Sequence, residues 1–532
     1  MTFMGRTVRV ILAVVIAGTV IVSSGTIKAQ ELTIGTRSEM TLDPHHFWST
    51  PNRAYNVQLY GSLIRLDQHL RPQPMLAQSW TLVDDTTWEF KLAPNARFHN
   101  DHPVTAEDVK ASFDRALNLK NAAASYRGAI EGIKEYHVVD EHTIRFMTKR
   151  TDPALLNEVA QIAIIPREIA TAATQADFIS GRAAIGAGPY KFAEYQPGNR
   201  LVLTRNDGYF GQKAKWSRVT FRTITDDSAR VAALLGGDVD VIDLVPPNFI
   251  VKIKGEKQLQ VNIGISDRTM YLIPDTKRDQ SPFIRDVNGQ PLDKNPLKDL
   301  RVRKAIAFAI DRNALVQKIM QGAGQPAGQT VAPGVLGYAP KLSEIPYDLA
   351  EAKSLLGEAG YPNGFAMTIH CTNDRYINDA QICQALAQML ARLGLKMDVQ
   401  TLPRAVFFPK ITDHRGERTS LALLAFGSGT TGDAGGVLNN TIHSLDPERG
   451  FGAWNVGHYS NKAIDDLIEK AAVTMDSDKR GAMEMDAVTK AMDDLAVIPL
   501  FHSFVIVGSK KGIHYDAYAD ESTLADAATP VQ

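Results

Sequence analysis

The sequence has very few cysteines. Cys371 and Cys383 are the only two in 532 residues, and neither lies near the N-terminus, so a lipid-attachment cysteine is excluded. The two thiols could pair in an oxidising compartment. Their positions resemble a strand end and a helix interior, however, and we expect two buried free thiols rather than a disulfide.

An excess of charge of either sign is also missing. The formal net charge is −1 at pH 7, and no long run of like charge occurs. Nucleic-acid-binding proteins usually have a basic patch, and a charged tail requires a run of residues with the same charge. We therefore expect no nucleic-acid partner and no charged interaction tail.

Catalytic motifs are absent as well. The sequence contains no G-x-S-x-G, Walker A, C-x-x-C or H-E-x-x-H pattern. These patterns are common signatures of hydrolase, nucleotide-binding and zinc sites. The pair His45-His46 and the pair His99 and His102 lack a third ligand at a recognisable spacing. We expect no enzymatic activity, no cofactor and no resident metal.

One apolar run stands out, and it lies at the N-terminus. Arg6 and Arg9 precede the apolar segment Val10–Val22, and a polar stretch then ends at Ala29. This order is that of a secretory signal peptide. An uncleaved anchor is the alternative, but thirteen residues fall short of the ~20 that span a bilayer. We expect residues 1–29 to be a cleaved signal peptide and the mature protein to be free in a periplasm, not a lipoprotein.

The rest of the chain has an ordinary soluble composition. A length of 532 residues exceeds one hydrophobic core and suits two or three domains. Asp379–Leu393 has the apolar spacing of a helix and stops at Gly394, and Met397–Thr401 then alternates as a strand. Repeated helix–glycine–strand order of this kind favours α/β layers.

The stretch Tyr60–Leu117 carries the most specific signal. Trp88–Leu92 alternates as a half-buried strand, and Thr105 is placed to cap a helix with Asp108 in its first turn. Taken together, YGSLIRLD, PMLAQSW, DDTTWEFKL and FHNDHPVTAEDV resemble the solute-binding proteins of peptide-type ABC importers, the oligopeptide-, dipeptide- and nickel-binding family 5. Later segments are similar to the same family: Gly186–Asn206, Gly236–Leu244, Asn295–Asp311, Tyr347–Phe365 and Gly457–Glu469.

The resemblance implies an α/β, two-lobed periplasmic binding protein fold with a hinge and a ligand cleft. It also implies an inserted extra subdomain on the first lobe. The expected segments are 31–53, 180–268 and 498–532 for lobe I, 54–179 for the inserted subdomain and 269–497 for lobe II. In such a fold the lobes close around the ligand about the hinge.

A glycine-rich loop follows the apolar strand Leu421–Phe426. The run Gly427-Ser428-Gly429-Thr430-Thr431-Gly432 fits G-x-G-x-x-G, but a dinucleotide site needs a helix directly afterwards. Asp433-Ala434-Gly435-Gly436 follows instead and has poor helix propensity. We therefore expect a loop that exposes its backbone toward a ligand at the end of a strand.

The same loop departs from the family it resembles. In peptide-binding relatives it carries an aspartate that pairs with the α-ammonium group of the peptide, shortly after a tryptophan. Phe426 stands at the tryptophan position, and Gly429 stands at about the aspartate position. A buried amine without an anion would be costly. Either Asp433 or another carboxylate substitutes, or the ligand is not an ordinary peptide.

Other candidates follow expected strands. Asp243 could bind a cationic group, or it could cap a helix or turn. Arg404 matches a cleft position in the family and could hold a carboxylate or phosphate bidentately, or it could form a surface salt bridge.

Two further groups could line the cleft. Asn373, Asp374 and Tyr376 lie in a polar loop after a strand, which suits a cleft wall, although the loop could instead cap the next helix. Trp48 and Thr50 match cleft-lining positions of the first lobe, and a packed core tryptophan is the alternative for Trp48.

The sequence thus predicts the periplasmic substrate-binding component of an ABC importer. It would capture a small polar, peptide-like solute between two lobes and deliver it, as a monomer, to an inner-membrane permease. Opines, modified amino acids, short saccharides or a metal complex are alternative ligands. A secreted hydrolase and a chemoreceptor partner are alternative roles.

Overall fold

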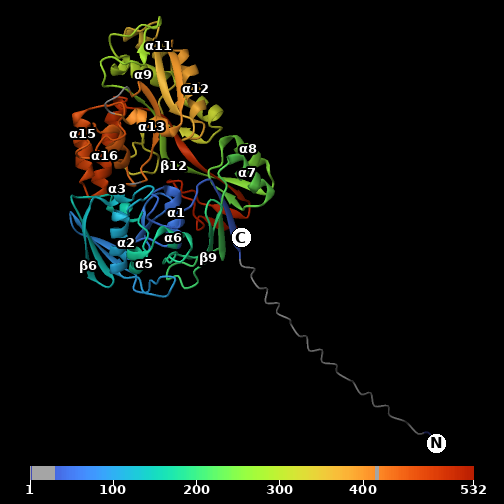
Figure 1. Ribbon diagram of the computed structural model, residues 1–532. Helices are drawn as coiled ribbons and strands as arrows, with labels where there is room; N and C mark the ends of the chain where they lie inside the picture. Colours follow the sequence, from blue (N-terminus) through green and yellow to red (C-terminus); the bar gives the residue numbers. More distant parts are fainter. Residues whose placement is uncertain (1, 3–29, 414–417, 430, 532) are drawn as a thin grey trace.

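The structure is a computed structural model that describes residue 2 and residues 30–531, except 414–417 and 430. The expected signal peptide, apart from residue 2, and Thr430 of the glycine-rich loop lie outside the described residues. Figure 1 shows a lower body that holds α1, α2, α3, α5 and α6 and an upper body that holds α9, α11, α12, α15 and α16, with β12 running between them. Of the helices that the structure describes, none is both long and apolar enough to cross a membrane.

A sheet of twelve strands extends through both bodies. Its order is β13-β15-β17-β12-β18-β11-β1-β10-β9-β8, with β14 added on β18 and β16 on β15. The bounds are β1 Glu31–Thr36, β8 Tyr190–Gln196, β9 Arg200–Arg205, β10 Arg218–Thr223, β11 Val241–Ile242, β12 Leu259–Pro274, β13 Ile284–Arg285, β14 Gly324–Pro326, β15 Ala366–Thr372, β16 Lys396–Leu402, β17 Leu421–Phe426 and β18 Ile498–Lys510. The long antiparallel pair β12 and β18 joins the two bodies.

β12 is irregular in the middle of its length. Its pairing with β18 shifts register between Ile265 and Thr269, so Ser266, Asp267 and Arg268 lie outside the regular ladder. The backbone N–H of Asp267 instead donates to the carbonyl oxygen of Ala519 at 3.0 Å. A bulge of this kind bends a strand and re-aims its side chains, and here it directs polar residues to the place where the two bodies meet.

The lower body contains a second, antiparallel sheet with the order β4-β5-β7-β6. Its strands are β4 Ala77–Asp84, β5 Thr87–Leu92, β6 Ile133–Asp140 and β7 Thr143–Thr148. The rings of Phe90 and Phe113 pack against Phe146 with centroids 5.3 and 4.9 Å away. Short pairs complete the strands: β2 Ile64–Leu66 with β3 Pro72–Pro74, and β19 Ile513–Tyr515 with β20 Ala528–Pro530.

The helices of the lower body are α1 Thr50–Leu59, α2 Ala106–Asn118, α3 Arg127–Ile130, α4 Leu155–Val159, α5 Arg167–Ala172 and α6 Gln175–Ile179. The predicted cap of α2 is confirmed. The backbone N–H of Asp108 donates to Thr105 Oγ1 at 3.4 Å, and the Thr105 N–H donates to Asp108 Oδ2 at 2.9 Å, which is a capping box. β5 likewise confirms the strand expected at Trp88–Leu92.

The remaining helices begin after β10. They are α7 Asp227–Gly236, α8 Pro247–Gly255, α9 Leu300–Ala309, α10 Arg312–Ala314, α11 Leu349–Glu358, α12 Asp379–Ala391, α13 Arg404–Thr412, α14 Gly435–Val437, α15 Lys462–Ala472 and α16 Ser477–Asp493, with a 3-10 turn at Pro296–Lys298 and π-helical turns at Leu315–Ile319 and Leu438–Ile442. The expected helix and strand around Gly394 are confirmed by α12 and by β16, which pairs in parallel with β15.

Candidate functional site

The glycine-rich loop after β17 packs against the bend of β12. A Cβ built on Gly427 would stand 2.6 Å from Oδ2 of Asp267, and one built on Gly429 would stand 3.2 Å from the same atom. The backbone N–H of Gly429 donates to this carboxylate. A side chain at Gly427 would displace the carboxylate of Asp267, and one at Gly429 would contact it closely. Asp267 thus places a carboxylate beside Gly429, the position at which the sequence has no acid.

The surroundings of Asp267 leave its charge incompletely balanced. The neighbouring Arg268 lies with Nε 3.2 Å from Glu521, and Asp520 adds a further carboxylate. Burial raises the pKa of Asp267 to about 7; the charge of Arg268 opposes the rise, and Glu521 and Asp520 add to it. Asp267 is 5 % exposed. A cationic group placed beside it would favour the ionised form and relieve this cost.

Arg53 completes the set of charges. Its guanidinium lies 3.9 Å from the carboxylate of Asp520. Arg375, whose charge also acts on Glu521, adds a third guanidinium to those of Arg53 and Arg268, against the three carboxylates of Asp267, Asp520 and Glu521. With every group ionised the cluster is neutral, but the nearest guanidinium groups are engaged by Asp520 and Glu521, and a ligand ammonium beside Asp267 would balance its charge directly.

Asp267, Arg268 and Glu521 are not among the site residues predicted from the sequence. A signal was present, since Asp267-Arg268 interrupts an otherwise largely apolar strand sequence, GISDRTMYLIP. Charged residues are almost never buried in a strand without a partner. The charged pair does not indicate which residues contact it, however, because the glycine-rich loop and Glu521 lie far away in the chain.

Two aromatic side chains, those of Phe426 and Tyr376, lie at the end of β17. Phe426 is half-buried and lies 6.4 Å from the ring of Trp454. The Tyr376 hydroxyl donates to the carbonyl oxygen of Ala425 at 3.4 Å and accepts from the N–H of the same residue at 3.3 Å. Tyr376 is thereby held across the end of β17, next to the glycine-rich loop.

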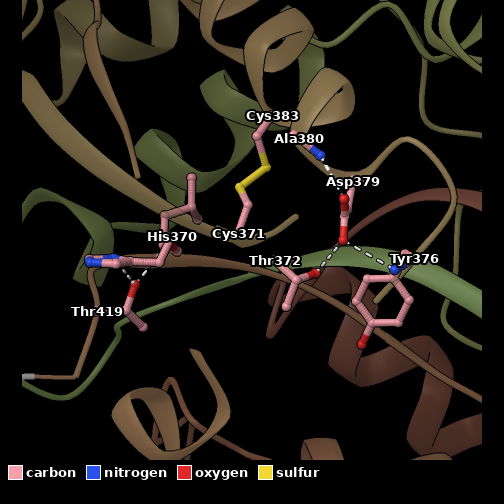
Figure 2. The surroundings of a disulfide bond; sticks show 9 residues. His370, Cys371, Thr372, Tyr376, Asp379, Ala380, Cys383 and Thr419 are labelled. Carbon is pink, nitrogen blue, oxygen red and sulfur yellow. Dashed lines mark hydrogen bonds between the residues drawn. A yellow bond between two sulfur atoms is a disulfide. The ribbon is translucent and has the colours of Figure 1, made fainter. Parts of the chain in front are cut away.

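The loop that contains Asn373, Asp374 and Tyr376 is held by a carboxylate of the next helix (Figure 2). Oδ2 of Asp379, the first residue of α12, accepts hydrogen bonds from Thr372 Oγ1 at 2.6 Å and from the Tyr376 N–H at 3.1 Å. Asn373 and Asp374 are exposed. The alternative that this loop caps the next helix is wrong, because the N-cap residue Asn378 makes no side-chain capping bond and Asp379 of the helix instead holds the loop. Asp374 accepts from the N–H of Arg404, the first residue of α13.

The expectation of two free thiols is wrong. Cys371 at the end of β15 and Cys383 inside α12 form a disulfide (Figure 2), with Cα atoms 6.7 Å apart. The expected strand end and helix interior are correct, but α12 packs back onto β15, which brings the two positions within the usual reach of a disulfide. The bond fixes the base of the 373–376 loop to the helix behind it.

Arg404 lies on the exposed side of the same region. Its backbone N–H donates to Asp374 Oδ1 at 2.7 Å, whereas its guanidinium is 62 % exposed and lies 3.9 Å from Asp374 Oδ2. The guanidinium is loosely held and available to a ligand anion, so a role in binding stays a prediction.

Asp433 has an internal partner. Its Oδ2 accepts from Nε of Arg480 at 2.9 Å, and it is 5 % exposed. Burial raises the pKa of Asp433, and the charge of Arg480 opposes that rise. Burial likewise raises the pKa of the adjacent Glu484 to about 9, with a smaller contribution from Asp433. The ion pair with Arg480 leaves Asp433 a poor anchor for a ligand amine.

The Asp433 loop touches the lower body. A Cβ on Gly432 would stand 2.5 Å from Nδ2 of Asn157, which belongs to α4. Asp152, just before α4, feels the charge of Asp433, and burial is the main cause that raises the pKa of both Asp152 and the nearby Glu158. The two bodies therefore meet here at Gly432 and Asn157, beside carboxyl groups with pKa values that burial raises.

Asp243 is also occupied. Its carboxylate accepts from Thr36 Oγ1 at 2.8 Å and from the Arg37 N–H at 3.0 Å, and Nε of the fully buried Arg230 lies 3.5 Å away. Thr523 Oγ1 donates at 3.2 Å. Burial raises the pKa of Asp243, and Arg230 opposes the rise. This residue joins β1, α7 and the C-terminal segment.

Trp48 and Thr50 lie at the start of α1. Trp48 is 38 % exposed, so the alternative of a packed core tryptophan is wrong. Its indole N–H donates to Gln161 Oε1 at 2.8 Å, and Phe47 beside it is equally exposed. Thr50 Oγ1 accepts from Arg53 at 3.2 Å. These side chains are therefore presented on the lower body near Arg53 of the charge cluster.

The histidine pairs show no metal geometry. His45 is buried and contacts Arg115 and the carbonyl oxygen of Ala163, and burial lowers its pKa to about 4. Among the residues that the structure describes, no three His, Cys, Asp or Glu side chains are arranged to hold a metal ion.

Comparisons with known proteins agree with this architecture. A family model described as "Bacterial extracellular solute-binding proteins, family 5 Middle" matches residues 71–446. The glutathione-binding protein GsiB of Salmonella typhi is 26 % identical over 480 residues, which cover 89 % of each chain.

Two solved structures share the fold. The periplasmic binding protein AgaA from A. tumefaciens R10, in complex with agropinic acid, is 24 % identical, with a TM-score of 0.70 over 94 % of this chain and 99 % of that one. The ABC transporter-associated periplasmic binding protein DppA from Helicobacter pylori, in complex with the peptide STSA, is 20 % identical, with a TM-score of 0.70 over 95 % and 99 %. The two bodies are thus the lobes of a periplasmic binding protein fold. By the match over residues 71–446, the chain belongs to the bacterial extracellular solute-binding proteins of family 5, the substrate-binding components of ABC importers.

Proposed function

We propose that this protein captures a small, peptide-like solute that carries a protonated amine, and that Asp267 binds the amine. The observation that carries the proposal is the approach of the buried Asp267 to Gly427 and Gly429, while the neighbouring Arg268 is engaged by Glu521. Glutathione and the peptide STSA, the ligands named for GsiB and DppA, both have an α-ammonium group. Such a group beside Asp267 would form a charge-assisted hydrogen bond in a desolvated place.

The other candidates take roles around this anchor. Phe426 and Tyr376 supply an aromatic wall, and the backbone of Gly427 and Gly429 gives the ligand close access to Asp267. Arg404 binds a ligand carboxylate at the rim. Trp48, Thr50, Asn373 and Asp374 line the approach. Asp243 and Asp433, each paired with an arginine, hold segments of the lobes in place.

The proposal includes the organisation and setting of the protein. Lobe I consists of 31–53, 180–268 and 498–532, the inserted subdomain of 54–179 and lobe II of 269–497. The protein is exported to the periplasm by residues 1–29, without a lipid anchor, and works there as a monomer with an inner-membrane permease. It binds no nucleic acid and catalyses no reaction.

Calorimetry with matched ligands tests the proposed ligand class. Glutathione, the dipeptide Met-Leu and the N-acetylated form of each would be titrated into the purified protein, together with agropinic acid. We expect binding of at least one free amine and a loss of tenfold or more on acetylation, about 1.4 kcal/mol. Equal binding of free and acetylated forms, or binding of agropinic acid alone, would contradict an amine-specific site.

A further inference from the structure

A cavity of about 620 Å³ lies in the lower body. It is formed by one face of α1, the edge of β2 to β4, the loop Tyr209–Lys215 and the C-terminal segment Tyr518–Asp526, and none of its lining residues comes from 269–497. Lobe motion therefore leaves it intact. Its size falls within the range of ~300–1,000 Å³ found for small-molecule sites.

The charges that line this cavity are unequal. Arg65 and Lys215 both attract the carboxylate of Asp526, the pKa of which is raised by burial. No ion pair within 4 Å is recorded for either cation in the part of the chain that the structure describes, whereas Lys213 beside them is paired with Asp207 at 2.7 Å. Asp520 also lines the cavity, and its carboxylate is paired with Arg53 at 3.9 Å. Arg65 and Lys215 thus share the one carboxylate of Asp526, and one positive charge is left for an incoming anion.

Arg53 supplies a second polar contact. It lines the cavity from α1, and its Nε is buried and has no hydrogen-bond partner among the described residues. A buried donor without an acceptor is rare and costs free energy. Because this nitrogen is not exposed to the cavity, a carboxylate, phosphate or sulfonate oxygen would reach it once the Arg53 side chain, which is 15 % exposed, turned toward the cavity.

The other lining residues are apolar or aromatic. Tyr209 and Phe210 lie with ring centroids 4.8 Å apart, and Tyr518 and Leu524 come from the C-terminal segment. Flat rings in a partly buried pocket offer a large contact area and stack on flat or branched groups. The surface therefore suits an apolar body attached to an anionic head.

We infer that this cavity is a second ligand site, separate from the interlobe cleft, which takes a small organic anion with an aromatic or branched apolar body. Arg65 and Lys215 bind the anionic head, and Arg53 donates to it. The rings of Tyr209, Phe210 and Tyr518 contact the apolar body.

The second site is connected to the cleft through Arg53. The guanidinium of Arg53 lies 3.9 Å from Asp520, and the Cβ of Asp520 lies 3.8 Å from a Cβ built on Gly429. An anion that draws Arg53 toward the cavity leaves the carboxylates beside Asp267 less balanced. On the proposed function of the cleft, the anion then strengthens binding of a cationic ligand, and by linkage each ligand raises the affinity of the other by the same factor.

Titration calorimetry with phenyl phosphate, in the absence of any cleft ligand, tests the site. We expect saturable binding to one site, weakened tenfold or more by Arg65→Gln combined with Lys215→Gln. The matched control, Lys91→Gln of β5 with Lys149→Gln directly after β7, removes the same charge from exposed positions outside the cavity and leaves binding unchanged.

Two further probes test the ligand class. Inorganic phosphate and benzyl alcohol should each bind at least tenfold more weakly than phenyl phosphate. Equal binding of inorganic phosphate would overturn the apolar contribution, and equal binding of benzyl alcohol would overturn the anionic one. The absence of saturable phenyl phosphate binding, or equal loss in the control variant, would overturn the site. Failure of the cleft ligand to bind leaves these readouts unaffected, so the two proposals fail separately.

Discussion

Asp243 and Asp267 are two buried carboxylates on segments that both border β18, and their surroundings differ. Their exposed fractions are 6 % and 5 %, and burial raises the pKa of both. Asp243 has the buried Arg230 and three hydrogen-bond donors. Asp267 has a backbone donor, and the nearest guanidinium, that of Arg268, is engaged by Glu521. A fully partnered carboxylate stabilises the fold, whereas an incompletely partnered one is suited to bind a cation.

Removing the partner of Asp243 should have the largest effect. Arg230→Met leaves the Asp243 carboxylate buried without its countercharge, which typically costs about 3–5 kcal/mol. Urea unfolding would measure the loss. The double variant Arg230→Met with Asp243→Leu should recover much of it, because no unpaired charge remains. A loss under about 1 kcal/mol in the single variant would show that this pair behaves as an exposed one.

Neutralising Asp267 should affect binding rather than stability. Asp267→Asn keeps the size of the side chain and removes the charge, and we expect affinity for an amine ligand to fall about 10–100-fold, or about 1.4–2.7 kcal/mol. Stability should stay the same or rise, since a costly buried charge is lost. Calorimetry and urea unfolding on the same samples would separate the two effects. Full affinity in this variant would remove Asp267 from the site.

The pH dependence should distinguish binding from stability at Asp267. Its pKa is raised from 3.8 to about 7, so the protonated form contributes stability that is fully present below 3.8 and is lost as pH rises through about 7. Amine binding needs the ionised form, so affinity should fall by up to about tenfold per pH unit below 7. Asp267→Asn should abolish this slope, and an unchanged slope in the variant would assign it to another group.

Arg404 should give the smallest change. Because its guanidinium is 62 % exposed, Arg404→Ala should weaken binding of a ligand carboxylate by only about two- to fivefold, which is under about 1 kcal/mol. The melting temperature should change little, since only one loose ion pair is lost. Calorimetry with a ligand and its carboxamide analogue would check the assignment. If Arg404→Ala weakens binding of the ligand and of its carboxamide analogue by the same factor, Arg404 does not contact the carboxylate.

Local sequence predicted much of the framework. The Thr105 cap, the strand Leu421–Phe426 and the α12–Gly394–β16 order depend on residues within a few positions of one another, and the structure confirms each. The glycine loop was also located correctly after its strand. The family resemblance then supplied the two-lobed arrangement that local patterns could not.

The long-range partners could not be predicted in this way. Asp267 contacts Gly429 because the pairing of β12 with β18 shifts register between Ile265 and Thr269. No sequence pattern within either segment predicts that contact. Asp433 was predicted as an alternative anchor for the ligand amine, but Arg480 of α16 lies beside it and donates a hydrogen bond to its carboxylate. The Cys371–Cys383 disulfide depends on how closely α12 packs on β15. The spacing of the two cysteines in the sequence does not determine that packing.

The central claim, that Asp267 anchors a ligand amine, can be tested before the ligand is known. Wild-type protein and Asp267→Asn would be purified side by side from their own periplasm and examined by native mass spectrometry, with fragmentation of whatever is released. We predict that the wild type releases a solute with a basic nitrogen and that the variant is largely empty. A solute without a basic nitrogen, or the same occupancy in both proteins, would contradict the account.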